Sequence, residues 1–92
     1  MLKTFIVKVT PSKDGRFITG ECGGAVEAIE RDHARTAGEC AVDLAETVIN
    51  RVCLAHAVEP LRWSVADHGP QESPWDKTLW VWAECLLTEI DA

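Results

Sequence analysis

Residues 78–87 read TLWVWAECLL, and this stretch decides the fold because it is apolar on both sides. In an extended strand, successive side chains point to opposite faces. One set is then Leu79, Val81, Ala83, Cys85 and Leu87, and the other set contains Trp80, Trp82 and Leu86. A chain of 92 residues builds one hydrophobic core, so its own elements are expected to cover one of these two faces. The function of the chain therefore depends on what covers the other face.

The composition is that of one globular domain spanning residues 1–92. Hydrophobic residues make up 47% of the chain and charged residues 26%, which lies outside the range of disordered proteins. No apolar run approaches the roughly 18 residues that span a bilayer, and the opening MLKTFIVKVTP lacks a cleavage site, so we expect a strand there. We therefore expect a cytoplasmic protein with no membrane partner, in which four widely spaced cysteines remain reduced.

The net charge of −6 is unevenly distributed along the chain. Residues 1–20 carry four basic residues against Asp14, whereas residues 21–46 carry seven acidic residues against two arginines. An acidic protein is repelled by phosphate backbones, so free duplex DNA is not the expected partner. If the first hairpin and the helix start are neighbours, basic residues gather at one end and can contact a phosphate or an RNA backbone: Lys8, Lys13, Arg16, Arg31 and Arg35.

Strands are predicted on both sides of a central helix. Period-two alternation predicts strands over residues 3–10, 16–22 and 61–67, in addition to 78–87. The segment PSKDG at 11–15 predicts a hairpin turn. Gly23 and Gly24 predict a bulge or break, after which residues 25–29 either extend the second strand or form a third.

An apolar stripe with steps of three and four residues predicts one long helix. Its members are Ala34, Ala37, Ala41, Leu44, Val48, Val52 and Ala55. Two N-caps compete, Asp32 and the Thr36–Glu39 capping box, and we favour Asp32 because Ala34 keeps phase with the stripe. The helix is expected to end near Ala57, after about 25 residues and 37 Å. The predicted fold is α+β, in the order ββαββ, with a four- to five-stranded antiparallel sheet and one long helix packed on one face.

One helix leaves the second face of such a sheet open. If Val81 and its set face the helix, Trp80, Trp82 and Leu86 lie on the open side, and we expect Trp63 of the 61–67 strand beside them. Exposed apolar patches mark interaction sites, and tryptophan is enriched among interface hot spots. These residues are therefore candidates for a partner or homodimer surface. The alternative is that Trp75 in the preceding loop, or the N-terminal strand, covers this face and makes the tryptophans core.

No catalytic constellation stands out, and we expect a non-enzymatic protein without metal or cofactor. The pair Cys53-x-x-His56, with His68 and Cys85 as further candidates, is one mixed half-site, whereas structural zinc sites normally combine two close pairs. Cys22 in GECGG lies beside glycine N–H groups that can stabilise an oxyanion, but no third orienting group is identifiable. Glycine-rich phosphate motifs are absent. The rival interpretation is a small thiol- or metal-dependent enzyme.

Residues 26–49, VEAIERDHARTAGECAVDLAETVI, follow a glycine-broken hairpin and precede two more strands. In architecture, length and acidity, nearly the whole chain resembles small phage-encoded anti-CRISPR proteins, notably inhibitors of type I effector complexes. The resemblance implies a stoichiometric inhibitor that docks on a CRISPR RNA-guided surveillance complex in the host cytoplasm. Such an inhibitor contacts Cas subunits, with the guide RNA as a further contact, and blocks target DNA binding. These inhibitors share no binding motif, so no family residue is carried over.

Residues 7–24, VKVTPSKDGRFITGECGG, give a second resemblance. A strand, a DG turn, a strand ending near Cys-Gly and a following helix are similar to the HicB-type antitoxin pattern. This resemblance implies a protein that binds and neutralises a toxin. HicB proteins usually continue into a DNA-binding module, whereas this chain continues into a tryptophan-rich hairpin, so the antitoxin is the second hypothesis.

Overall fold

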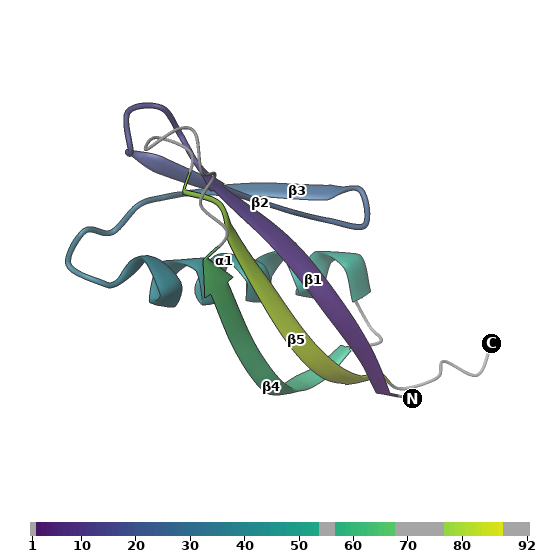
Figure 1. Ribbon diagram of the computed structural model, residues 1–92. Helices are drawn as coiled ribbons and strands as arrows, with labels where there is room; N and C mark the ends of the chain where they lie inside the picture. Colours follow the sequence, from purple (N-terminus) through teal and green to yellow (C-terminus); the bar gives the residue numbers. More distant parts are fainter. Residues whose placement is uncertain (1, 54–56, 68–76, 88–92) are drawn as a thin grey trace.

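The computed structural model describes residues 2–53, 57–67 and 77–87 as a sheet with a helix packed against one side (Figure 1). The elements in chain order are β1 (Leu2–Pro11), β2 (Phe17–Cys22), β3 (Ala25–Glu30), α1 (Ala37–Cys53), β4 (Ala57–Asp67) and β5 (Leu79–Leu87). The five strands pair antiparallel in the order β3-β2-β1-β5-β4, which makes β1 the central strand. The predicted α+β fold, an antiparallel sheet with one helix on one face, is confirmed.

The glycine pair between β2 and β3 closes a tight hairpin. Gly23 and Gly24 have φ angles of 54° and 83°, and Cys22 pairs with Ala25 across them. A two-residue type I′ turn requires left-handed conformations at both positions, which glycine adopts without steric cost. Residues 25–30 are therefore a third strand of their own, and not an extension of the second.

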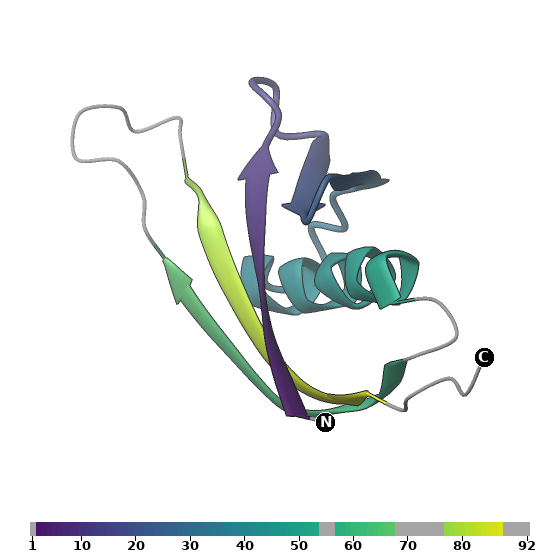
Figure 2. The same cartoon turned by 90° about the vertical axis from the view of Figure 1, so that its right-hand side faces the viewer.

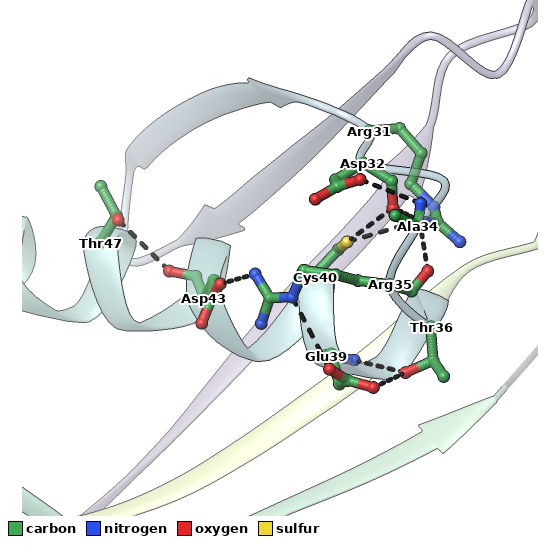
Figure 3. Close-up of polar contacts among 9 residues, drawn as sticks. All are labelled: Arg31, Asp32, Ala34, Arg35, Thr36, Glu39, Cys40, Asp43 and Thr47. Carbon is green, nitrogen blue, oxygen red and sulfur yellow. Dashed lines mark hydrogen bonds and ion pairs between the residues drawn. The ribbon is translucent and has the colours of Figure 1, made fainter.

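The helix begins later than expected. Thr36 caps α1, because Glu39 donates its N–H to Thr36 Oγ1 at 3.2 Å and the Thr36 hydroxyl donates to the Glu39 carboxylate at 3.0 Å (Figure 3). Asp32 instead accepts a hydrogen bond from the N–H of Ala34 at 2.9 Å and closes a separate turn. The predicted start at Asp32 was therefore wrong, since its carboxylate stabilises the connection that precedes the helix.

The helix also ends earlier than expected. The last described helical residue is Cys53, and Ala57 already belongs to β4, so the predicted helix end near Ala57 and the predicted strand start at residue 61 were both wrong. The 17 residues of α1 extend about 25 Å. The register of β4 against β5 shifts on both sides of Pro60, which marks an irregularity of the kind that an edge strand tolerates. This proline interrupted the sequence pattern and hid the first part of the strand.

One face of the sheet, called the covered face, packs against α1. Its core consists of Phe5, Val7, Val9, Ile18, Val81, Ala83 and Cys85 from the strands, and Cys40, Ala41, Leu44, Ala45, Val48, Ile49 and Cys53 from the helix. The closest approach is at Gly20 on β2, where a Cβ atom would lie 2.9 Å from Leu44 Cγ and 3.1 Å from Val48 Cγ2. The predicted stripe is correct for Leu44 and Val48, whereas Val52 near the helix end is 36% exposed.

The sheet twists over the helix. In Figure 1, β2 and β3 run across the direction of β4 and β5, and α1 lies behind β1 and β5. Figure 2 shows α1 on one side of the sheet that β1, β5 and β4 form, with no described helix on the other side, which we call the open face. Within the described ranges, no helix has the length and apolar character that crossing a membrane requires.

Candidate partner-binding surface

Apolar side chains from β1 and β5 meet on the open face. The antiparallel register places Leu2 opposite Leu86 and Ile6 opposite Trp82, and Trp80 follows on the same side of β5. These five residues share one face of the two strands, where the polar pair Thr4 and Glu84 lies between Leu2–Leu86 and Ile6–Trp82, and we call the five residues the apolar strip. Its aliphatic members are 57% (Leu2), 46% (Ile6) and 43% (Leu86) exposed, although the alternate residues of both strands are buried in the core.

The two tryptophans of the strip are partly exposed. The Nζ atom of Lys8 lies 5.9 Å from the ring centroid of Trp80, which is within the range of a cation–π interaction. Trp82 lines a hollow of about 260 Å³ whose other walls are Thr4, Arg62, Ser64 and Glu84. An apolar centre bordered by hydroxyls and charges of both signs is the arrangement found in protein–protein interfaces.

Trp80, Trp82 and Leu86 thus lie opposite the helix, where residue alternation predicted them. The N-terminal strand does not cover them, because β1 is the central strand of the sheet and lies beside β5 within it. Trp75, the other residue considered as a cover, lies outside the described residues.

Trp63 lies on the opposite side from the one expected. In the pairing of β4 with β5, Trp63 is opposite Ala83 and Ser64 is opposite Trp82. Trp63 therefore points to the covered face, where it packs partly buried against the core. The expectation that Trp63 lies beside Trp80 and Trp82 was wrong. Alternation divides the side chains of one strand into two sets, but the pairing register between strands decides which sets share a face of the sheet.

A second apolar group on the open face was not singled out from the sequence. Phe17 on β2 is 45% exposed and Val26 on β3 is 52% exposed. Val26 pairs with Glu21, and Glu21 pairs with Lys8, so both strands present these residues on the side of the strip. The signal was available, because Phe17 and Ile18 must point to opposite faces and Ile18 belongs to the core.

The basic residues predicted to gather at one end do so in part. Arg31 donates its backbone N–H to the carbonyl oxygen of Arg16 at 2.8 Å, which places the end of β3 beside the β1–β2 hairpin. Lys13 and Arg16 are exposed on that hairpin, and the guanidinium carbon of Arg16 lies 6.0 Å from the ring centroid of Phe17. Three of the five predicted basic residues, Lys13, Arg16 and Arg31, thus belong to neighbouring segments, whereas Lys8 lies on β1 beside Trp80.

Arg35, the last of the five, is engaged by acidic residues of the helix. It donates a hydrogen bond to Asp43 and lies 3.6 Å from the Glu39 carboxylate (Figure 3). The hydrogen bond to Asp43 is the main cause that raises the pKa of Arg35. Its charge is therefore largely balanced within the chain, and Arg35 is a weaker candidate for contacting a phosphate than the hairpin residues.

The four cysteines are free thiols. Cys40, Cys53 and Cys85 are buried and Cys22 is half-buried. Burial is the main cause that raises the pKa of Cys22, Cys53 and Cys85. A thiol with a raised pKa stays protonated at neutral pH and is a weak nucleophile, so the geometry offers little support for the thiol-enzyme interpretation.

The metal-site candidate is only partly visible. His56 and His68 lie outside the described residues. They are the two histidines of the candidate site that also includes Cys53 and Cys85. Among residues 2–53, 57–67 and 77–87, no group of three or more His, Cys, Asp or Glu side chains is placed to hold a metal ion.

Comparison with protein-family models, with curated proteins and with solved structures found no match to this chain. The functional inference therefore depends on the chemistry of the chain's own surface.

Proposed function

We propose that this protein is a non-enzymatic, stoichiometric inhibitor that docks the open face of its sheet on a host protein complex. The observation that carries the proposal is the apolar strip, which exposes two partly covered tryptophans and three aliphatic side chains. Large exposed apolar groups on one face of a small domain favour a macromolecular partner, because their removal from water supplies binding free energy.

The partner that we propose is a CRISPR RNA-guided surveillance complex in the host cytoplasm. The proposal follows from the resemblance to anti-CRISPR proteins in architecture, length and acidity. The strip would contact a Cas subunit, and the exposed Lys13 and Arg16 on the hairpin would lie toward the guide RNA. Docking in this way would block target DNA without the protein binding duplex DNA itself.

Two features of the surface support this arrangement over a protein that binds nucleic acid alone. The exposed side of α1 carries Glu39, Asp43 and Glu46, which outnumber the Arg35 cation that pairs with the first two, and the remaining negative charge repels a phosphate backbone and attracts basic residues of a protein subunit. Lys13 and Arg16 lie exposed on the hairpin, at a distance in the sequence from these acids. A protein subunit and an RNA backbone could thus be contacted by different parts of the same molecule.

The experiment measures binding of the purified protein to a purified type I surveillance complex, together with target DNA binding by that complex. Trp82→Ala is expected to weaken the association by about 2 kcal/mol, or roughly thirtyfold, because tryptophan at an interface centre is a typical hot spot. Charge reversal at Lys13 and Arg16 should also weaken the association, and the loss of affinity should be larger at low salt than at high salt.

Trp63→Ala is the matched control, because it removes the same side chain from the covered face. It should lower the stability of the free protein and leave the affinity of the folded fraction unchanged. Equal affinity of Trp82→Ala and the wild type would refute the docking surface. The proposed partner would be refuted if the protein did not bind the surveillance complex and instead used the strip to bind another partner. Binding to a toxin would favour the HicB-like alternative, and binding to a second copy of the chain would favour the homodimer.

A further inference from the structure

A cavity opens at one end of the covered face, where the β1–β2 hairpin, the β3–α1 connection and the start of β5 meet. Its volume is about 310 Å³. This is roughly twice the ~150 Å³ of an engineered apolar cavity that binds benzene. Val9 and Ile18 of the core, with the half-buried Leu79 that packs against it, line the cavity and form an apolar floor.

The mouth of the cavity is basic. Arg31, His33 and Lys77 line it, and His33 and Lys77 are exposed. These residues come from two segments that are distant in the sequence, in a chain whose net charge is −6. The first residue of α1, Ala37, also lines the cavity, so the positive end of the helix dipole adds to the same field.

Arg31 is held in position by hydrogen bonds within the β3–α1 connection, to which it belongs. Its Nη1 atom donates to the carbonyl oxygen of Asp32 and, at 3.0 Å, to that of Arg35, and it lies 3.4 Å from the buried Cys40 Sγ (Figure 3). A guanidinium fixed by one nitrogen keeps its other N–H groups for a ligand. A cation that is already ordered loses little side-chain entropy on binding, which favours a ligand with negative charge at this position.

We propose that this cavity binds a small organic molecule with an apolar body of one or two rings and a single carboxylate. The apolar floor accommodates the rings, and Arg31, His33 and Lys77 at the mouth attract the carboxylate. Inorganic phosphate does not satisfy this chemistry, because it would leave the apolar floor uncovered. The site is independent of the apolar strip, since its floor belongs to the covered face.

The test is a titration of ¹⁵N-labelled protein, followed by backbone amide shifts, with naphthalene-2-carboxylate and its neutral isostere naphthalene-2-carboxamide. The carboxylate is expected to bind with a dissociation constant of about 0.1–1 mM and to shift the amides of Gly15, His33, Ala37 and Leu79. The carboxamide and inorganic phosphate should bind at least about fivefold more weakly, because each lacks one half of the recognition.

The double variant His33→Gln/Lys77→Gln should weaken carboxylate binding about fivefold while its spectrum shows the native fold. Lys13→Gln is the matched control, since it removes an exposed cation from the same end of the molecule without lining the cavity. Equal binding of the carboxylate and the carboxamide would overturn the proposal, as would shifts confined to the strip around Trp82. A third result would also overturn the proposal: amides around the cavity that shift with protein concentration and do not respond to naphthalene-2-carboxylate. In that case a second copy of the chain would occupy the cavity.

Discussion

Both faces of β5 carry apolar residues, but the two faces meet different surroundings. Val81, Ala83 and Cys85 have no exposed surface, whereas Leu86 is 43% exposed and the two tryptophans are partly exposed. On the covered side the residues are small, and with Gly20 they let α1 approach closely. On the open side they are bulky, and no described element packs against them. The hydrophobicity of a side chain therefore does not by itself decide whether it is buried. Burial also requires a surface shape that lets another element, here α1, pack against it.

The polar residues of the two faces differ in the same way. The open face has Lys8, Arg62 and Glu84 beside its apolar strip. Among the described residues of the covered face, the ion pair between Arg51 and Glu27 lies at the β3 edge, where the arginine side chain is 61% exposed. A face that carries charges beside its central tryptophans suits a partner that forms and breaks contact, while a face whose ion pair lies at the edge suits a permanent core.

The largest expected difference in stability comes from truncating a leucine on the covered side and a leucine on the open side. Leu44→Ala, in the fully buried centre of α1, should lower the free energy of unfolding by about 3–5 kcal/mol, because it leaves a cavity in a packed core. Leu86→Ala, in the strip, should lower it by about 1 kcal/mol or less, since much of that side chain already contacts water. Urea unfolding of both variants measures the difference, and similar losses would mean that the two faces are equally buried.

A smaller effect should mark the place where the helix rests on the sheet. Gly20→Ala is expected to destabilise the protein by about 1–3 kcal/mol, because the new Cβ would press against Leu44 and Val48. Gly38→Ala, in the first turn of α1 with open space around it, should instead stabilise the protein by about 0.5–1 kcal/mol. Thermal unfolding separates these outcomes. A neutral Gly20→Ala variant would show that α1 does not lie against β2 at this distance.

Local patterns in the sequence predicted most of the fold. The alternation in residues 78–87 identified which residues of β5 share a face, and the spacing of Leu44 and Val48 identified the inner side of the helix. The sequence left two N-caps open, and the preference for Asp32 failed because a carboxylate can close a turn as well as cap a helix. The strand start at Ala57 was missed because Pro60 interrupts the pattern at an edge, where the sheet tolerates it.

Features that depend on contacts between distant segments could not be predicted. The face occupied by Trp63 depends on its pairing with Ala83, which no local pattern specifies. The role of Gly20 depends on the position of α1 above it. The basic mouth of the cavity combines Arg31 and His33 with Lys77, which lie more than forty positions apart in the chain but line one cavity once β5 is placed in the sheet.

The most direct test of the central claim compares adjacent residues of one strand, Val81→Gln and Trp82→Gln, by urea unfolding. Val81→Gln should lower the free energy of unfolding by about 4 kcal/mol or more, because an amide enters a core without a hydrogen-bond partner. Trp82→Gln should stay cooperatively folded with a loss of about 1–2 kcal/mol, because its amide remains in contact with water. Equal loss of structure in both variants would mean that the ring of Trp82 is sealed inside the free protein, and the open face would then not be a docking surface.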